Sequence, residues 1–410
     1  MTEVEKAWAA YNATVEETRQ RLFSHPFAHS GPDGGAQNRG AAWYYLQMVQ
    51  QGAFNLYIAP RPAYPHLWVF YSPYEMTVTQ SCPDFLHRKA MLDGRRTYRL
   101  WGRMGTTCWA DLQLMRGFWG DEDTATLGNH LFERFERDAD GRFEVILSAS
   151  EHDGDWLRLD PDSPHNLIHI REAFGDWETE IPIEMHLEEV GQPDEALTPT
   201  EEDMAARLDC AARYIRRATD FCLDITRDTV KHAGGVNRLW ALDAGTRQAE
   251  GGNPASYFFF MQCDLREDMA LVLTLDVDAR YWGLSLGDVW MRTVDFSYHQ
   301  GSLNHAQSVA DADGKVRLVL ALEDPGVHNW IDVNRLWQTN MVLRIYGYRA
   351  TPSATVAEVP LADLDAHLPA GTCRVDAGER ARILSRRTRA SLGRWGLWRS
   401  AGRCSFGTCA

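Results

Sequence analysis

Hydrophobic residues recur along this chain with two different periods, which alternate in blocks. Val4, Trp8, Tyr11 and Val15 recur at helical spacing, residues 26–35 interrupt this pattern, and residues 41–56 resume it. From residue 58 the apolar positions form short runs rich in aromatic and β-branched residues, separated by turn pairs such as Asp93-Gly94. The pattern predicts N-terminal helices over 1–57 and a first antiparallel β module over 58–195.

The helical period returns once, over residues 200–230. Thr200 and Asp203 resemble a capping box at its start, and Met204, Leu208 and Ile215 continue one apolar face. Short strand-like runs then resume between 257 and 348. We therefore expect a connecting helix within 196–235 and a second β module over 236–365, so the predicted fold class is mainly β with accessory helices.

Charge is distributed unevenly between the body and the C-terminal end. The formal net charge is −15, yet the forty residues from Gly371 onward hold nine arginines and two acids. An acidic body repels a phosphate backbone, so nucleic acid is not an expected partner. The basic tail over 366–410 is interpreted as a terminal helix packed on its own acidic body; contact with an acidic partner is the alternative.

Several classes of protein are disfavoured by missing patterns. No run of eighteen apolar residues predicts a membrane span, and residues 1–20 lack a signal-peptide core. The eight cysteines form no C-x-x-C pair, which is typical of free thiols in the cytoplasm. Nucleotide-binding and serine-hydrolase motifs are missing, so no cofactor is expected. His165 and His169 would lie about 13 Å apart on a strand, so no metal site is expected there either.

The C-terminal motifs resemble a known family. Ala279-Arg-Tyr-Trp282, Ser302-Leu-Asn304 and Glu323-Asp-Pro-Gly-Val-His-Asn-Trp330 are similar to the bacterial domain-of-unknown-function family numbered 1214. Upstream, Cys82-Pro-Asp84 and the tract 170–180 are similar to the N-terminal part of its longer members. The resemblance implies two β-sandwich or jelly-roll-like modules. After Asp332 the family usually has a glycine-histidine pair and a second glycine, where this chain has Asn334-Arg-Leu-Trp-Gln-Thr339.

One group of candidate catalytic residues lies in the tract 171–180. If this tract is extended, Asp176, Glu178 and Glu180 share a face and can raise one another's pKa, as a general acid and base require. Arg171 and Trp177 would then bind substrate. The structural alternative is an Arg171 salt-bridge network that fixes an edge strand.

A second group follows the Asp324-Pro-Gly326 turn. His328 and Asp332 are candidate proton-transfer residues, and Asn329 and Trp330 are candidate ligand contacts. The alternative is that they form a turn and its core. The other predicted substrate-binding residues are Tyr281, Trp282 and Asn304. Asn304 is expected in a loop, whereas Tyr281 and Trp282, with Trp290 and Tyr298, would line an aromatic cleft or fill the sandwich core.

Together these features favour a cofactor-independent acid–base enzyme of the lyase or hydrolase type, acting on a small hydrophobic or glycosidic compound. The rival hypothesis is a non-catalytic β-sandwich that binds carbohydrate or another small ligand through its tryptophans. A third is a scaffold that assembles through its amphipathic helix, and a homo-oligomer is compatible with the sequence.

Overall fold

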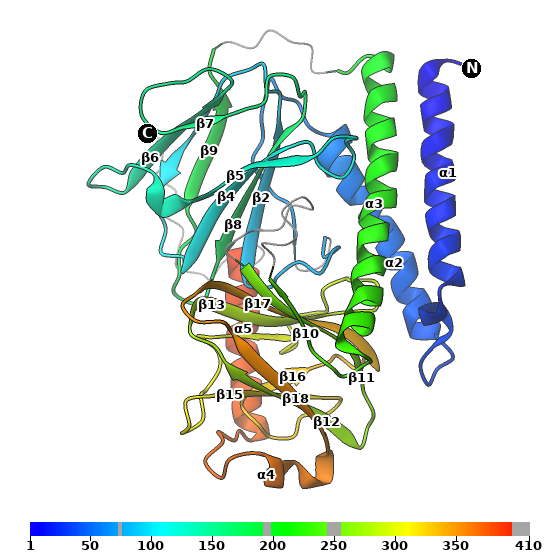
Figure 1. Ribbon diagram of the computed structural model, residues 1–410, viewed down its shortest axis with the longest axis vertical. Helices are drawn as coiled ribbons and strands as arrows, with labels where there is room; N and C mark the ends of the chain where they lie inside the picture. Colours follow the sequence, from blue (N-terminus) through cyan, green and yellow to red (C-terminus); the bar gives the residue numbers. More distant parts are fainter. Residues whose placement is uncertain (73–75, 192–197, 244–255, 396–410) are drawn as a thin grey trace, which may run out of the picture.

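The computed structural model describes residues 1–72, 76–191, 198–243 and 256–395. It contains two β halves and a long helix, which confirms the mainly β fold class predicted from the sequence (Figure 1). The last part of the basic tail, 396–410, lies outside the described residues. Among the described helices, none is both long and apolar enough to cross a bilayer.

The N-terminal half is a sandwich of two sheets. Its inner sheet has the order β1-β2-β8-β4-β5, formed by Trp68–Val69, Phe85–Leu92, Asn166–Ala173, Trp109–Arg116 and Ala125–Leu131. Its outer sheet has the order β7-β6-β3-β9, formed by Trp156–Arg158, Arg142–Ser148, Tyr98–Arg103 and Glu184–Glu189. Leu112 and Ile168 of the inner sheet pack with Leu100 and Val145 of the outer sheet in one buried core.

The C-terminal half is a second sandwich. Its inner sheet has the order β10-β11-β17-β13-β14, formed by Trp240–Asp243, Ser256–Asp264, Gln338–Tyr348, Ala279–Gly287 and Ser302–Asn304. Its outer sheet has the order β16-β15-β12-β18, formed by Trp330–Asp332, Val316–Ala321, Met269–Asp276 and Ser353–Pro360. Leu284 and Leu343 of the inner sheet pack with Leu273 and Leu318 of the outer sheet.

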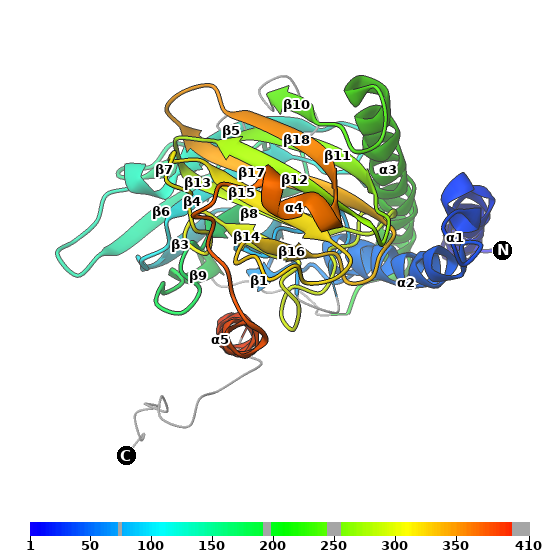
Figure 2. The same ribbon diagram turned by 90° about the horizontal axis from the view of Figure 1, so that it is seen from below.

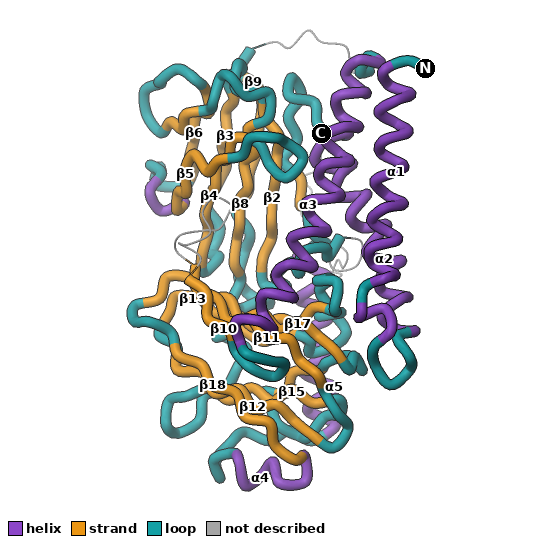
Figure 3. The backbone as a smooth tube through the Cα atoms, turned by 45° about the vertical axis from the view of Figure 1, so that its right-hand side comes forward, coloured by secondary structure: helices purple, strands orange, loops and turns teal. Residues whose placement is uncertain are grey.

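Three long helices lie beside the sandwiches: α1 (Glu3–Ser24), α2 (Ala36–Ala53) and α3 (Glu201–Ala233). The predicted capping box of α3 is present, because the Thr200 hydroxyl accepts from the Asp203 N–H and the Asp203 carboxylate accepts from the Thr200 N–H. The helix ends at Gly234, whose φ of 75° suits glycine. With 33 residues, α3 is about 50 Å long and runs along the N-terminal half to β10 and β11 of the C-terminal half (Figure 3).

The helices bury one face of the N-terminal inner sheet. Met91 of β2, Met115 of β4 and Leu167 of β8 share a core with residues of all three helices. A single π-helical turn, η2 (Phe54–Ile58), extends α2 and contacts α3. Short 3-10 turns are η1 (Pro26–His29), η3 (Phe132–Arg134) and η5 (Leu361–Asp363). This packing leaves both faces of the inner sheet inaccessible to solvent near α3.

The C-terminal end of the described chain is helical. After the short α4 (Leu364–His367), α5 (Ala377–Arg394) lies apart from α1, α2 and α3, as the view along its axis shows (Figure 2). Arg380 and Arg387 of α5 are buried against the protein's own body. This confirms, for residues 377–394, the interpretation of the basic tail as a helix packed on the protein itself.

Candidate active site

A block of polar side chains lies on the helix-facing side of the N-terminal inner sheet. Residues alternate between the two faces of a strand, so the residues at 87 and 89 of β2, 111 and 113 of β4, and 169 and 171 of β8 point to the same side. The strand register aligns them in two rows, since His87 and Asp111 flank Arg171 while Lys89 and Gln113 flank His169. We call these six residues the buried polar cluster: His87, Lys89, Asp111, Gln113, His169 and Arg171.

The side chains of this cluster are unusually buried for charged and polar residues. Lys89 and Asp111 are each 1% exposed, Arg171 is 6% exposed, and only His169 is partly exposed. Arg171 Nη1 donates to both oxygens of Asp111 at 3.2 Å, and its Nη2 donates to Gln113 Oε1. The guanidinium group is therefore held in one orientation by a carboxylate and an amide.

The amine of Lys89 lies among aromatic rings, and its pKa is lowered. Its amine lies 3.9 Å from the centre of the Phe70 ring and 5.1 Å from those of Tyr71 and Phe118. Burial, together with the nearby Arg171 charge, lowers the pKa of Lys89 to about 7. A substantial fraction of the amine is therefore neutral at physiological pH.

The two histidines are paired with each other. A hydrogen bond of 2.9 Å joins His87 Nδ1 to His169 Nε2. Burial, and then the charge of Lys89, hold the pKa of both imidazoles well below the usual value. Both rings are consequently neutral, and the pair connects the two rows of the cluster by a path along which a proton can move.

The C-terminal inner sheet packs against the opposite end of the same face. Tyr281 and Tyr346 share a small core with Phe85 and Trp109. Arg344, two residues before Tyr346 on β17 and therefore on the same face of the strand, is partly buried and lowers the pKa of His87 as Arg171 does. The cluster thus lies where α3 and both β halves meet, in a region to which distant parts of the chain contribute.

The ratio of arginine to lysine in this chain also singles out Lys89. The chain contains 38 arginines and four lysines, and the other three lysines, Lys6, Lys231 and Lys315, are not buried. An arginine cannot lose its proton at physiological pH, whereas a buried lysine can. A chain that uses arginine almost everywhere thus has an ionisable amine at its most buried cationic position.

A cavity of about 450 Å³ adjoins the cluster along β2. Met91, two residues beyond Lys89 on the same face, lines it, and so does Trp68, the cross-strand partner of Lys89. Tyr64, Pro65 and His66 form other parts of its wall. The buried Trp68 Nε1 has no hydrogen-bond partner in the structure.

Of the residues predicted from the sequence, Arg171 belongs to this cluster. The other five members were missed, and the missed signal is polar residues at a period of two inside apolar strands: His87-x-Lys89, Asp111-x-Gln113 and His169-x-Arg171. From the sequence, His169 was considered only together with His165, as a pair too far apart to bind a metal. His165 instead bonds to Asp121, with 2.6 Å between Nδ1 and Oδ1.

The expectation of an extended tract at 176–180 is wrong. These residues form a turn in which Asp176 accepts hydrogen bonds from the Glu178 N–H and the Thr179 hydroxyl. The Glu180 N–H bonds to the Asp176 carbonyl, so the three carboxylates do not share a strand face. Asp176 is an exposed cap of this turn, and Glu178 lies 3.8 Å from Arg386 of α5.

Three other predicted ligand contacts meet around a buried carboxylate instead. Asp84, 1% exposed, accepts from Trp177 Nε1 at 2.8 Å, Tyr281 Oη at 2.7 Å and Asn304 Nδ2 at 2.8 Å. These partners come from both β halves, so this junction fastens the halves together. A further aromatic candidate, Trp282, is 5% exposed and packs inside the C-terminal core.

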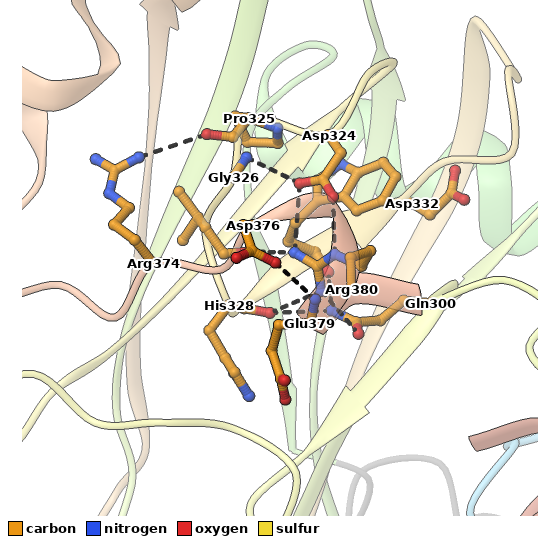
Figure 4. Close-up of polar contacts among 12 residues, drawn as sticks. Gln300, Asp324, Pro325, Gly326, His328, Asp332, Arg374, Asp376, Glu379 and Arg380 are labelled. Carbon is orange, nitrogen blue, oxygen red and sulfur yellow. Dashed lines mark hydrogen bonds and ion pairs between the residues drawn. The ribbon is translucent and has the colours of Figure 1, made fainter. Parts of the chain in front are cut away.

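The Asp324-Pro-Gly326 turn is anchored by Arg380 of α5 (Figure 4). Arg380 Nε donates to Asp324 Oδ2 at 2.8 Å, and its Nη2 donates to the Val327 carbonyl at 2.5 Å. Asp324 Oδ1 accepts from the Gly326 N–H, as expected for this turn. The buried Asn329 amide bonds to the carbonyls of Val309 and Arg317. This part of the motif is structural.

Asp332 and Trp330 line a second cavity, of about 580 Å³. Asp332 Oδ2 lies 2.7 Å from His299 Nδ1, whereas His328 Nδ1 contacts Asn329. Asn334 and Arg335, which belong to the tract 334–339 that departs from the family pattern, line this cavity too. Within the described residues, no hydrogen bond or ion pair joins His328 to Asp176 or Glu178.

One group of side chains offers donor atoms suited to a metal. The ligand atoms of Asp121, His165 and Cys210 lie within 4.8 Å of one another. Both Asp121 oxygens already bond to protein groups, including the Tyr57 hydroxyl at 2.9 Å, and Arg213 Nη2 lies 3.2 Å from the Cys210 sulfur. Protein contacts alone account for this group.

Comparisons with known proteins support the fold. A crystal structure of an uncharacterised protein from Burkholderia cenocepacia superposes with a TM-score of 0.79 and 24% identity, covering 87% of this chain and 97% of that one. The VPA0106 protein from Vibrio parahaemolyticus has a TM-score of 0.44 and 10% identity over 77% of this chain and 98% of its own. No curated protein matches the sequence. Residues 263–350 match the model of a family described as a protein of unknown function, DUF1214, so the C-terminal half carries a DUF1214 module, as its motifs predicted.

Proposed function

We propose that this protein is an acid–base enzyme of the lyase or hydrolase type and that Lys89 transfers the proton. The observation that carries the proposal is a buried amine whose pKa falls to about 7. General acid–base catalysis is most efficient when the catalytic pKa lies near the working pH, and such a group contributes about 10²- to 10⁴-fold to the rate.

The neighbours of Lys89 have complementary roles in this proposal. The neutral amine accepts a proton from the substrate and later returns it. The His87–His169 pair carries protons along the cluster, and Arg171, oriented by Asp111 and Gln113, stabilises negative charge that develops on the substrate. The aromatic rings around Lys89 exclude water, which keeps the amine neutral.

The proposal places this reaction in the cytoplasm, on a small-molecule substrate. The six described cysteines are free thiols, which suits a reducing compartment. The rival hypothesis of a non-catalytic binding protein stays a prediction; it requires no ionisable amine inside the protein.

The pKa of Lys89 can be measured directly. Protein labelled with ¹³C at the lysine ε-carbon should give four resonances, because the chain has four lysines, and Lys89→Met identifies the buried one. We expect the Lys89 resonance to titrate near pH 7. A Lys89 midpoint near 10 would refute the proposed role.

Turnover can be sought without knowing the substrate. Wild type, Lys89→Met and Lys315→Met are incubated with a mixture of bacterial metabolites, and consumption is followed by mass spectrometry. We expect any enzyme-dependent conversion to disappear in Lys89→Met and to persist in Lys315→Met, which alters a lysine remote in sequence and 3.7 Å from Asp276. Equal conversion by both variants contradicts the proposal.

A further inference from the structure

Arg344 contributes a cation to the junction of the two halves, and none of the described acidic residues pairs with it. Its Nη1 donates to Ser285 Oγ at 2.8 Å and its Nη2 donates to the Gln80 carbonyl. Thr79 and Gln80 have φ values of 61° and 49°, a backbone conformation that side chains other than glycine rarely adopt. The chain thus maintains a strained turn whose carbonyl orients this guanidinium group.

Positive charge exceeds negative charge around the cluster. Asp111 is paired with Arg171. In the described ranges, the Lys89 amine lies over aromatic rings and takes part in no hydrogen bond or ion pair, and Arg344 bonds only to neutral oxygens. Cations buried without a partner are costly, so proteins usually keep them where a ligand supplies the opposite charge.

His87 provides a third, independent pointer to a ligand. Its Nε2 is buried and has no hydrogen-bond partner among the residues that the structure describes, and the residue as a whole is only 8% exposed. Buried polar atoms are nearly always hydrogen-bonded, and an exception calls for a missing partner. The charges of Lys89, Arg171 and Arg344 each contribute to lowering the pKa of His87. Lys89 lies two residues away on the same strand face, and Arg171 is the cross-strand partner of His87.

We propose that the substrate carries a carboxylate, which pairs with Arg344 and reaches His87 Nε2, while the Lys89 amine stays free to take up the substrate's proton. This inference rests on the proposed function and names the substrate class of the same site. A carboxylate has one charge and two acceptor oxygens, which match these few donors better than a phosphate dianion does. The groups that face Lys89 are the Phe70, Tyr71 and Phe118 rings and, on the sheet, Arg171 and His169.

The experiment uses benzoate and its uncharged analogue benzamide as probes. Titrations of the ¹³C-labelled Lys89 resonance are repeated with each probe at saturating concentration. Because a bound anion favours the ammonium form, we expect benzoate to raise the Lys89 midpoint by about one pH unit or more and benzamide to leave it unchanged. Equal effects of both probes overturn the inference, and so does a midpoint that moves with inorganic phosphate but not with benzoate or acetate.

Variants locate the binding group. Arg344→Gln should weaken benzoate binding at least about tenfold, whereas Arg349→Gln, which alters an exposed arginine paired with Asp278, should not change it. Unchanged affinity in Arg344→Gln overturns the assignment. If Arg344→Gln does not fold, Arg344→Lys, which keeps the charge, replaces it and should retain part of the affinity; the benzoate and benzamide comparison in the wild type decides in either case.

Failure of this inference and failure of the proposed function give different results. The Lys89 midpoint in the absence of any probe tests the function alone. If the Lys89 midpoint without a probe is near pH 7 and benzoate does not move it, Lys89 remains the proposed proton-transfer group, and the inference of a carboxylate substrate is wrong. A free midpoint near 10 removes the proposed function whatever the probes do.

Discussion

At the scale of single residues, Lys89 makes stability depend on pH. Its pKa is about 7 in the folded protein and 10.5 in an unfolded chain, so between these values only the unfolded state holds the proton. Stability therefore rises with pH across this window, by about 1.4 kcal/mol per unit from this group. Lys89→Met should remove that slope and should be more stable than the wild type near pH 7, as urea unfolding at pH 7.5 and 9.5 can measure. Parallel pH profiles of the two proteins would contradict this expectation.

Arg335 offers a test of backbone strain beside the second cavity. It has a φ of 57°, following Asn334 at 56°, and both residues lie in the left-handed region that favours glycine. Arg335→Gly should raise the free energy of unfolding by about 0.5–1 kcal/mol, because Cβ is disfavoured at this φ. Arg335→Val should lower it by about 1 kcal/mol or more, since a β-branched residue fits still less well. Urea unfolding compares both; a loss of stability with glycine would show that the side chain matters more than the strain.

The sequence revealed only one member of the cluster, Arg171, for a physical reason. Polar residues at a period of two look like the solvent face of an antiparallel strand, and here that face is covered by α3 and by the C-terminal half. Nothing within β2 indicates that Lys89 is buried, because the covering residues lie far away in the chain. The motifs at 176–180 and 324–332 attracted attention because their charges are adjacent in sequence.

At the scale of elements, Arg380 fixes α5 to the family motif. Its guanidinium group donates hydrogen bonds to the Asp324 carboxylate, the Gln300 side-chain oxygen and the carbonyls of residues 327 and 328 (Figure 4). Arg380→Gln should cost about 3–5 kcal/mol, since it leaves a carboxylate and several buried oxygens unpaired. Arg382→Gln, on the exposed side of the same helix, should cost less than about 1 kcal/mol. Urea unfolding and limited proteolysis of α5 measure the difference; similar losses in both would contradict the anchoring role.

Elements with a local cause were the easiest to predict. The capping box and apolar face of α3 are encoded in adjacent residues, and both appear as expected. The tract 176–180 failed because a single cap, Asp176, satisfies the backbone of a turn and so competes with the extended form. Alternation of polar and apolar residues therefore predicts strands less reliably where an aspartate can bond to the backbone beyond it.

At the scale of the whole molecule, Asp84 joins the two β halves. Trp177, Tyr281 and Asn304 all donate to its carboxylate, and a Cβ added at Gly283 would lie 2.4 Å from it. In the Asp84→Asn variant, an amide NH2 group would replace one of the oxygens that accept these hydrogen bonds. The free energy of unfolding should therefore fall by about 3 kcal/mol. Asp123→Asn, an exposed control, should have little effect. Hydrogen exchange should show faster opening of β13 and β14 in Asp84→Asn only; unchanged exchange there would show that other contacts hold the halves together.

The match to DUF1214 and the folding unit of the C-terminal half have different boundaries. Residues 263–350 contain β17 and β12, but each of these strands pairs with a neighbour outside the range. β17 pairs with β11, of which only the last two residues are included. β12 pairs with β18, which is excluded. A fragment cut at the limits of the match would turn two central strands into exposed edges, which are prone to aggregate. The segment that sequence comparison recognises is thus smaller than any segment that can stand alone, and a working fragment would have to extend from β10 to β18 at least.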